Sequence, residues 1–318
     1  MKVIFLGTPD FSVETLKAII KSKHELLAVV TQPDKPSGRG EKLTCSPVKI
    51  VASENGIKVL QNEKIRTQGV DDLKSLAPDV MVTCAYGQIL SQEIIDIAPH
   101  GIINVHASLL PKYRGAAPIQ QAVLNGDKET GVTIMQTEAG IDCGDVIAVE
   151  KTPIGYNETT GELFDRLSLI GAKLLVKTLD EIENGTATFT PQNQALASNV
   201  KMLKKSDGII DFSKDSETIH NFVRGMNPWP CAFTYLNEKL LKVYAAESLS
   251  CPEATDKTPG QIIFCDNKNG FVVACKNGAV RLTSVQLEGK KRISDVDFAI
   301  GQRADTTINA VLGVNRDA

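Results

Sequence analysis

The chain has 318 residues, of which 42% are hydrophobic and 23% charged, so it is long enough for two domains that each bury a core. No apolar run approaches the roughly 20 residues of a membrane-spanning helix, and the first residues lead into a strand pattern without a signal-peptide core. The seven cysteines are scattered and include no Cys-x-x-Cys pair, which argues against a disulfide framework and a zinc site. We therefore expect a cytoplasmic protein with reduced cysteines and no bound metal.

The formal net charge of −3 conceals an asymmetry between the two halves. Residues 1–200 contain 19 basic and 24 acidic side chains, a balance of −5, whereas residues 201–318 contain 16 and 14, a balance of +2. The second half includes three basic clusters, which are Lys201, Lys204 and Lys205, then Lys239 and Lys242, then Lys290, Lys291 and Arg292. Solvated surface explains any one cluster, but three together favour contact with a nucleic-acid phosphate backbone.

The first half alternates strand and helix patterns. Lys2–Leu6 is a short apolar run, a helical pattern starts at Phe11, and Leu26–Val30 is a second strand. Further strand patterns are Val80–Ala85, Ile102–His106 and Val132–Met135, and the helical patterns among them are Pro47–Asn55, Val70–Leu76, Ser91–Ile97 and Pro118–Asn125. This alternation predicts an α/β unit with a Rossmann-like, mostly parallel sheet and helices on both faces. Its ligands would lie beyond the carboxyl ends of the strands.

Two familiar nucleotide motifs are missing from this unit. Gly7-Thr8-Pro9 follows the first strand, but it is not a G-x-G-x-x-G sequence, and Pro9 has no backbone N–H to offer a phosphate. A Walker A sequence is absent as well. NAD and ATP chemistry are therefore disfavoured. Gln32–Ser46, with two prolines, two glycines and five charges, is expected to be a long functional loop without secondary structure, or else simply a solvated one.

The second half changes character along its length. A long helix is predicted from Thr160 to about Asn184, and the polar, aperiodic stretch Thr186–Met202 is interpreted as a linker. One helical piece, Glu217–Arg224, then precedes five strand-like runs separated by Asn- and Gly-rich turns. The runs are Phe233–Leu236, Leu240–Ala245, Gly260–Phe264, Phe271–Ala274 and Val280–Gln286. They predict a small β-barrel.

Candidate catalytic residues cluster around the strand Ile102–His106. Side chains two apart on a strand share a face, so Asn104 and His106 project together, and Gly-flanked Asp142 follows downstream. A lone histidine at a strand end is more often structural, but an amide two residues before it and a Gly-flanked carboxylate downstream favour a catalytic set, and such a set suits acyl transfer. Asn104 would stabilise an oxyanion, His106 would relay a proton, and Asp142 would orient the imidazole. Cys143 is an alternative nucleophile, although an amine acceptor needs no covalent intermediate.

Five segments carry a resemblance to a known family. They are Val3–Phe11 (VIFLGTPDF), Thr31–Gly40 (TQPDKPSGRG), Asn104–Gln120 (NVHASLLPKYRGAAPIQ), Gly131–Asp145 (GVTIMQTEAGIDCGD) and Asn227–Pro230 (NPWP). Across both halves the chain resembles the folate-dependent formyltransferases, and the second and fifth segments resemble the tRNA-directed branch. Cys143 departs from the family pattern, which more often has Thr there. The catalytic set itself does not depart.

The resemblance implies a monomeric enzyme that transfers formyl from 10-formyltetrahydrofolate to the α-amino group of methionyl initiator tRNA. Residues 1–189 would then be the catalytic domain, 190–206 a linker and 207–318 a tRNA-binding barrel of the oligonucleotide-binding (OB) type. The implied folate site comprises Ser108, Leu109, Leu110 and Pro111, Tyr86, Gly87, Gln88, Ile89 and Leu90, together with the backbone of Glu138–Asp142. The expected tRNA contacts are Arg39, in the loop implied to reach the acceptor end, and Lys204, Lys205, Lys290 and Lys291.

Three other functions remain open from sequence. A formyltransferase for a sugar amine or a purine precursor would share the catalytic half, as would a formyl-folate hydrolase. A non-catalytic RNA-binding protein would also fit the basic second half. The intact set Asn104, His106 and Asp142 argues against that last reading.

Overall fold

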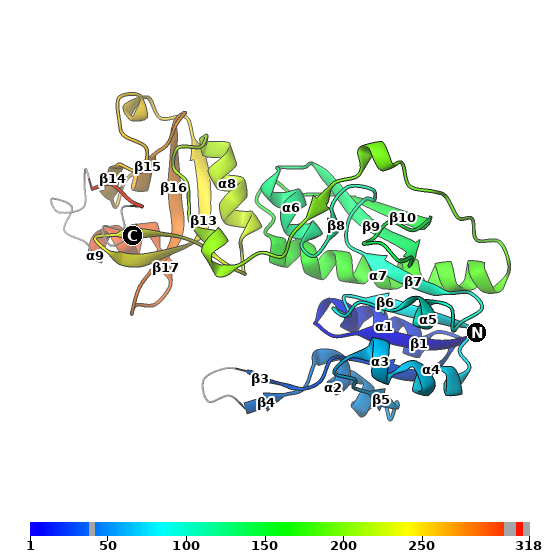
Figure 1. Cartoon of the computed structure of the whole chain (residues 1–318). Coiled ribbons are helices and arrows are strands. Elements are labelled where there is room, and N and C mark those ends of the chain that lie inside the picture. The colour runs from blue at the N-terminus through cyan, green and yellow to red at the C-terminus, as the bar shows by residue number, and fades with distance from the viewer. Residues whose placement is uncertain (38–41, 302–309, 314–318) are drawn as a thin grey trace. The chain divides into compact units, whose positions relative to one another are not determined.

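The computed structural model describes residues 1–37, 42–301 and 310–313 (Figure 1). The chain forms two compact units. The N-terminal unit consists of Met1–Pro118, Glu129–Pro153 and Phe164–Val200, and the C-terminal unit of Ile119–Lys128, Ile154–Leu163 and Lys201–Ala318. Two short segments from the first half of the sequence thus belong to the C-terminal unit. No helix in the described part of the chain is both long and apolar enough to cross a membrane.

The N-terminal unit is built on a seven-stranded sheet with the order β10-β9-β7-β6-β1-β2-β5. Its strands are β1 (Lys2–Gly7), β2 (Glu25–Val30), β5 (Val59–Leu60), β6 (Val80–Cys84), β7 (Ile102–His106), β9 (Glu129–Gln136) and β10 (Val146–Pro153). The adjacent strands β5, β2, β1, β6 and β7 pair in parallel, whereas β9 and β10 are antiparallel to their neighbours. This confirms the predicted mostly parallel sheet and adds an antiparallel edge.

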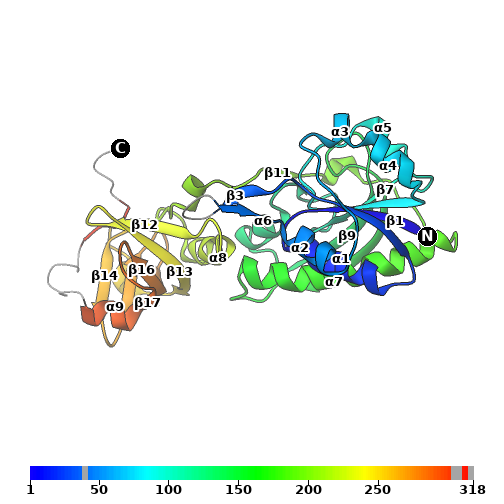
Figure 2. The same cartoon turned by 90° about the horizontal axis from the view of Figure 1, so that it is seen from below.

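Helices cover both faces of this sheet, as predicted. Figure 2 shows α1, α2 and α7 on one side of the strands and α3, α4 and α5 on the other. Their bounds are α1 (Phe11–Lys21), α2 (Pro47–Glu54), α3 (Ile65–Gln68), α4 (Val70–Leu76), α5 (Gln92–Ile95) and α7 (Thr160–Glu183). On the α7 side, Gly171 packs so closely on Val105 that a Cβ there would lie 2.9 Å from its Cγ1. Ile102 shares a face of β7 with Asn104 and His106, because it lies two and four residues before them. It belongs to the core on the face opposite α7.

The loop Gln32–Ser46 contains secondary structure, contrary to expectation. Strands β3 (Lys35–Ser37) and β4 (Lys42–Thr44) pair antiparallel, so the segment is a hairpin. Its base is held by Asp34, whose Oδ2 lies 2.6 Å from Lys49 Nζ and whose Oδ1 accepts a hydrogen bond from Gln61. Charged and proline residues obscured the short strand pattern. Arg39 lies outside the described residues.

The C-terminal unit contains an antiparallel sheet with the order β12-β13-β16-β15-β14, and β17 pairs with β16. Its strands are β12 (Ala232–Leu236), β13 (Lys239–Leu249), β14 (Ile262–Asp266), β15 (Gly270–Ala274), β16 (Ala279–Leu287) and β17 (Ile293–Ser294). The helices are α6 (Pro118–Leu124), α8 (Ser216–Gly225), α9 (Asp295–Gly301) and the 3₁₀ turns η2 (Lys205–Gly208) and η3 (Pro252–Ala254). All five predicted strands are present, and the arrangement is consistent with the expected OB-like barrel.

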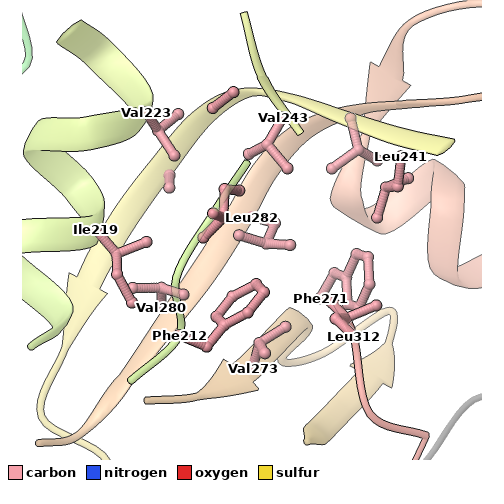
Figure 3. Close-up of a cluster of buried hydrophobic side chains, with 14 of the residues drawn as sticks. Phe212, Ile219, Val223, Leu241, Val243, Phe271, Val273, Val280, Leu282 and Leu312 are labelled. Atoms are coloured by element: carbon pink, nitrogen blue, oxygen red, sulfur yellow. The ribbon is translucent and has the colours of Figure 1, made fainter. Parts of the chain in front are cut away.

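A small apolar cluster around Val272 and a large apolar core hold this unit together. Figure 3 shows side chains from α8, β13, β15 and β16 converging on it, including Ile219, Val243 and Leu282. Phe271 is fully buried and stacks on Phe298 with ring centroids 4.9 Å apart. Alternating inward residues give most of these strands one buried face, which is why the short runs were recognisable from sequence, whereas β15 is buried on both faces.

Candidate active site

The structure brings Asn104, His106 and Asp142 together at the carboxyl end of β7. Asn104 and His106 lie on β7, and Asp142 comes from the loop between β9 and β10. Asn104 Nδ2 is 3.4 Å from Asp142 Oδ1, and His106 Nδ1 is 3.5 Å from Asp142 Oδ2. The two oxygens of one carboxylate therefore face the two β7 side chains. This is the arrangement that the period-two pattern and the resemblance predict.

Thr83 on the neighbouring strand β6 fixes the orientation of Asn104. The two residues are aligned in the parallel register, and Thr83 Oγ1 donates a hydrogen bond to Asn104 Oδ1 at 3.0 Å. With its oxygen occupied, the amide presents its N–H groups toward the Asp142 side. Sequence analysis had not singled out Thr83. A polar residue inside the otherwise apolar strand Val80–Cys84 was the available signal.

Asp142 adopts a backbone conformation that is uncommon for a residue other than glycine, with φ of +46°. Its Oδ2 accepts a 2.8 Å hydrogen bond from the backbone N–H of Gly115. Gly144 packs against the chain so tightly that a Cβ there would lie 2.1 Å from the carbonyl oxygen of Gln136. Glycine at this position is therefore required for the loop to fold back on β9 and bring the carboxylate to the histidine.

His106 is 6% exposed and has a defined ring orientation. Its Nε2 lies 2.9 Å from the carbonyl oxygen of Tyr113. Because a carbonyl oxygen only accepts hydrogen bonds, Nε2 carries a hydrogen, and Nδ1 on the Asp142 side is the ring atom left to exchange a proton. Tyr113 has φ of +62° and was not predicted as part of the site.

The loop from Ser108 to Pro111, predicted to line the folate site, is held by its own hydrogen bonds. Ser108 Oγ donates to the carbonyl oxygen of Lys112, and Thr133 Oγ1 donates to that of Ser108. The backbone N–H of Leu110 in turn donates to Thr133 Oγ1 at 3.2 Å. A loop tied down in this way offers a fixed wall to a ligand.

The second predicted folate segment, Tyr86–Leu90, borders a cavity of about 490 Å³. Gln88 Oε1 accepts from the backbone N–H of Ile65 and its Nε2 donates to Asn62, whereas Ile89 is 80% exposed. The cavity residues are Gln32, Pro33, Lys35, Glu63, Lys64, Arg66, Gln88 and Ile89. Its volume falls in the range of small-molecule sites, and Gln88 and Ile89 are the members of the predicted folate segment that line it.

Tyr86 itself is buried, and burial raises the pKa of its hydroxyl to about 12. Its carbonyl oxygen accepts hydrogen bonds from Thr8 Oγ1 and Gln32 Nε2, so the segment is anchored to the residues that follow β1 and β2. Gly87 has φ of +81°, and a Cβ there would lie 2.5 Å from Gln32 Nε2. The start of the predicted folate-binding segment Tyr86–Leu90 is therefore a rigid turn.

Cys143 is partly exposed beside Asp142. Its Sγ lies so close to Gly140 that a Cβ on that glycine would approach it to 2.4 Å. This contact gives the thiol a packing role inside the loop.

The four predicted tRNA lysines are exposed in the C-terminal unit. Nearby, the guanidinium of Arg292 lies 4.4 Å from the ring centroid of Tyr244, and its Nε donates to Ser284. The ring contact and this hydrogen bond hold the cation at the surface. The predicted set is Lys204, Lys205, Lys290 and Lys291.

Comparison with known proteins agrees with this geometry. The family model "Formyl transferase" matches residues 1–179, and "Formyl transferase, C-terminal domain" matches residues 202–303. The methionyl-tRNA formyltransferase of Lachnospira eligens is 48% identical over 312 residues, covering 97% of this chain and 99% of that protein. That of Agathobacter rectalis is 50% identical over 302 residues, covering 95% and 96%. The chain belongs to the methionyl-tRNA formyltransferase branch of the formyl transferase family.

Solved structures share the formyl transferase fold. WlaRD, a sugar 3N-formyl transferase crystallised with dTDP and 5-N-formyl-THF, has a TM-score of 0.66 and 22% identity, covering 92% of this chain and 99% of that one. HypX from Aquifex aeolicus in complex with tetrahydrofolic acid has a TM-score of 0.62 and 16% identity, covering 93% and 46%. The predicted resemblance is thus confirmed at the level of family and fold.

Proposed function

We propose that the chain transfers the formyl group of 10-formyltetrahydrofolate to the α-amino group of methionine carried by initiator tRNA, and so supplies the start of translation. The observation that carries this proposal is the joint placement of an amide, an imidazole and a carboxylate around Asp142. Relatives named methionyl-tRNA formyltransferase, 44–50% identical over nearly the whole chain, identify the acceptor.

The side chains supply what amine formylation requires. Attack of the amine nitrogen on the formyl carbon forms a C–N bond and places negative charge on the formyl oxygen, which an Asn104 N–H would stabilise. The attacking nitrogen then loses one proton, which His106 Nδ1 would receive with the help of the Asp142 carboxylate. Collapse of the oxyanion re-forms the C=O bond and breaks the bond from the formyl carbon to folate N10, and the proton held at His106 passes to N10 as it leaves. A metal ion is not needed in this scheme.

We assign the other predicted regions to the same proposal. Residues 1–189 would be the catalytic domain, 190–206 the linker, of which residues 190–200 pack on the N-terminal unit, and 207–318 the tRNA-binding domain of a cytoplasmic monomer. Support for the last assignment comes from the +2 balance of residues 201–318 and the four exposed lysines in that unit. The segments Ser108–Pro111 and Tyr86–Leu90 would contact folate, and Arg39 and the lysines would contact tRNA.

A competition between acceptors tests this proposal. The purified protein is mixed with 10-formyltetrahydrofolate labelled in the formyl carbon and with methionyl initiator tRNA, a nucleotide-linked amino sugar, glycinamide ribonucleotide or buffer alone. We expect label on the methionine of the tRNA and background transfer elsewhere. Faster transfer to a small amine, or release of formate at the same rate with and without tRNA, would replace this function with a different acceptor or with hydrolysis.

A further inference from the structure

The stretch interpreted as a linker begins as a strap over the catalytic loops. Residues 164–200 belong to the N-terminal unit. Thr190 pairs with Val146, and β11 (Asn199–Val200) pairs with β8 (Arg114–Gly115) in the loop that follows β7. A 3₁₀ turn, η1 (Gln194–Leu196), lies between these two pairings. The strap is therefore fixed at both ends, directly beside the loops that carry Asp142 and Tyr113.

Gln192 lies near the start of the strap, two residues after Thr190, and is 8% exposed. Its Nε2 donates to two carbonyl oxygens of the catalytic loop, that of Asp142 at 2.9 Å and that of Gly144 at 2.7 Å. The two amide hydrogens are thus both used on the segment that holds the catalytic carboxylate.

Arg114, which is 7% exposed, fixes which way the Gln192 amide points. Its Nε and Nη2 donate to Gln192 Oε1 at 3.1 and 2.7 Å, and its Nη1 donates to Gln194 Oε1 at 2.9 Å. Because a guanidinium has only donors, the Gln192 oxygen must face Arg114, and the nitrogen must face the loop. A charged donor also strengthens the amide's own hydrogen bonds.

A buried guanidinium that bonds to amide oxygens is an expensive way to hold a surface strap. The buried Arg114 guanidinium has a function if the backbone of Asp142 must be held in place. That residue has φ of +46°, a conformation that a non-glycine side chain keeps only when its surroundings enforce it. Gln192 donates hydrogen bonds to the carbonyl oxygens of Asp142 and Gly144, and the Gly115 N–H donates one to the Asp142 carboxylate itself.

We propose that Gln192 and Arg114 are positioning residues for the formyl transfer, and that they hold the Asp142 backbone so that its carboxylate faces His106. The proposal rests on the proposed function for the identity of the reaction. The hydrogen bonds that it uses lie within the N-terminal unit. The amide of Gln192 bonds the backbone of the Asp142 loop, and the guanidinium of Arg114 bonds the amide oxygens of Gln192 and Gln194. Their effect must therefore pass through the Asp142 carboxylate.

The test is a pair of matched substitutions, Gln192→Glu and Gln194→Glu. Both keep an oxygen for Arg114, but Gln192→Glu removes the two donors to the loop and puts a carboxylate oxygen against two carbonyls. We expect kcat to fall by about 10- to 100-fold for Gln192→Glu, since misplacement of a catalytic group by about 1 Å has effects of that order. KM for both substrates should change little. Tm of Gln192→Glu should fall, because two buried carbonyls lose their donor, and kcat of Gln194→Glu should stay within about 2-fold of wild type.

A double-mutant cycle with Asp142→Ala separates positioning from general structural damage. When the carboxylate is gone, Gln192→Glu should lower the single-turnover rate no further, because there is nothing left to position. An equal fall in both backgrounds, or an unchanged kcat in the wild-type background, would overturn the proposal. If the acceptor proves to be another amine or water, the same cycle is measured on that reaction.

A second readout needs no turnover. The chain has four histidines, so the ring nitrogens of His106 can be assigned in ¹⁵N spectra. The Nδ1 resonance in Gln192→Glu should move toward its position in Asp142→Ala, while Gln194→Glu should match wild type. An unmoved resonance in a folded Gln192→Glu protein would contradict the positioning role, even if no formyl acceptor were found.

Discussion

Thr83→Val is a sharp test of the oxyanion role given to Asn104. Valine preserves most of the shape of this 8% exposed side chain but removes the hydroxyl that donates to Asn104 Oδ1 at 3.0 Å. The bond to be lost contributes about 1 kcal/mol, so the amide orientation preference falls by roughly 5-fold. Complete loss of the donor, as in Asn104→Ala, is expected to lower kcat by about 100- to 1,000-fold.

We therefore expect kcat for methionyl-tRNA formylation to fall by about 5-fold in Thr83→Val, with KM for both substrates near wild type. Thr83→Ser retains the hydroxyl and serves as the control, with kcat within about 2-fold of wild type. Steady-state kinetics with saturating donor give these values, and Tm of each variant reports on packing. The reasoning is refuted if Asn104→Ala keeps near-normal kcat, or if Thr83→Val and Thr83→Ser lose activity equally.

Three further predictions concern other parts of the molecule. His106→Ala and Asp142→Ala should each lower turnover by at least about 100-fold in single-turnover assays, and a folded variant with near-normal rates would remove the catalytic assignment. Neutral replacement of the four lysines should raise KM for tRNA and flatten its salt dependence by up to about one unit of slope per lost phosphate contact, with folate KM unchanged as the internal control. The substituted residues are Lys204, Lys205, Lys290 and Lys291. Burial lowers the pKa of His220 below its ordinary value of about 6.5, so as pH falls the unfolded chain binds this proton before the folded chain does. The stability that is present above pH 6.5 is therefore lost as pH falls toward the lower folded pKa. His220→Gln should show a smaller fall in Tm than wild type between about pH 7.5 and 5.5.

The structure around His220 explains the sign of that last prediction. Its Nε2 lies 3.1 Å from Asn157 Oδ1, and the ring stacks on Tyr156 with centroids 4.6 Å apart. Nδ1 is buried and has no hydrogen-bond partner in the described structure. Protonation would place a charged N–H in a site with no acceptor. An equal fall in Tm in wild type and His220→Gln would contradict this account.

Periodic patterns predicted the parts of the fold that depend on local sequence. The alternation in Ile102–His106 was sufficient to place Asn104 and His106 on one face, because strand geometry alone determines it. The apolar strands Lys2–Leu6 and Val80–Ala85 were likewise visible. Family and fold followed from longer motifs that combine these strands with the loops after them.

Contacts between distant segments could not be predicted in the same way. Gln192 reaches Asp142 across 50 residues, and Tyr113 N–H donates to Ser198 Oγ across 85, and neither pairing leaves a periodic trace. The stretch that looked like a linker therefore concealed a strap. The β3–β4 hairpin was missed because each strand has three residues, too few to show alternation.

The central claim is that Asn104, His106 and Asp142 move a formyl group from folate N10 to the amine of methionyl initiator tRNA. The most direct measurement is a single-turnover experiment that follows label leaving 10-formyltetrahydrofolate and arriving on methionine in the same quenched samples. The two rates should be equal in wild type and should fall together, by at least about 100-fold, in His106→Ala and Asp142→Ala. Label that leaves folate without reaching methionine, or transfer that both variants retain, would contradict it.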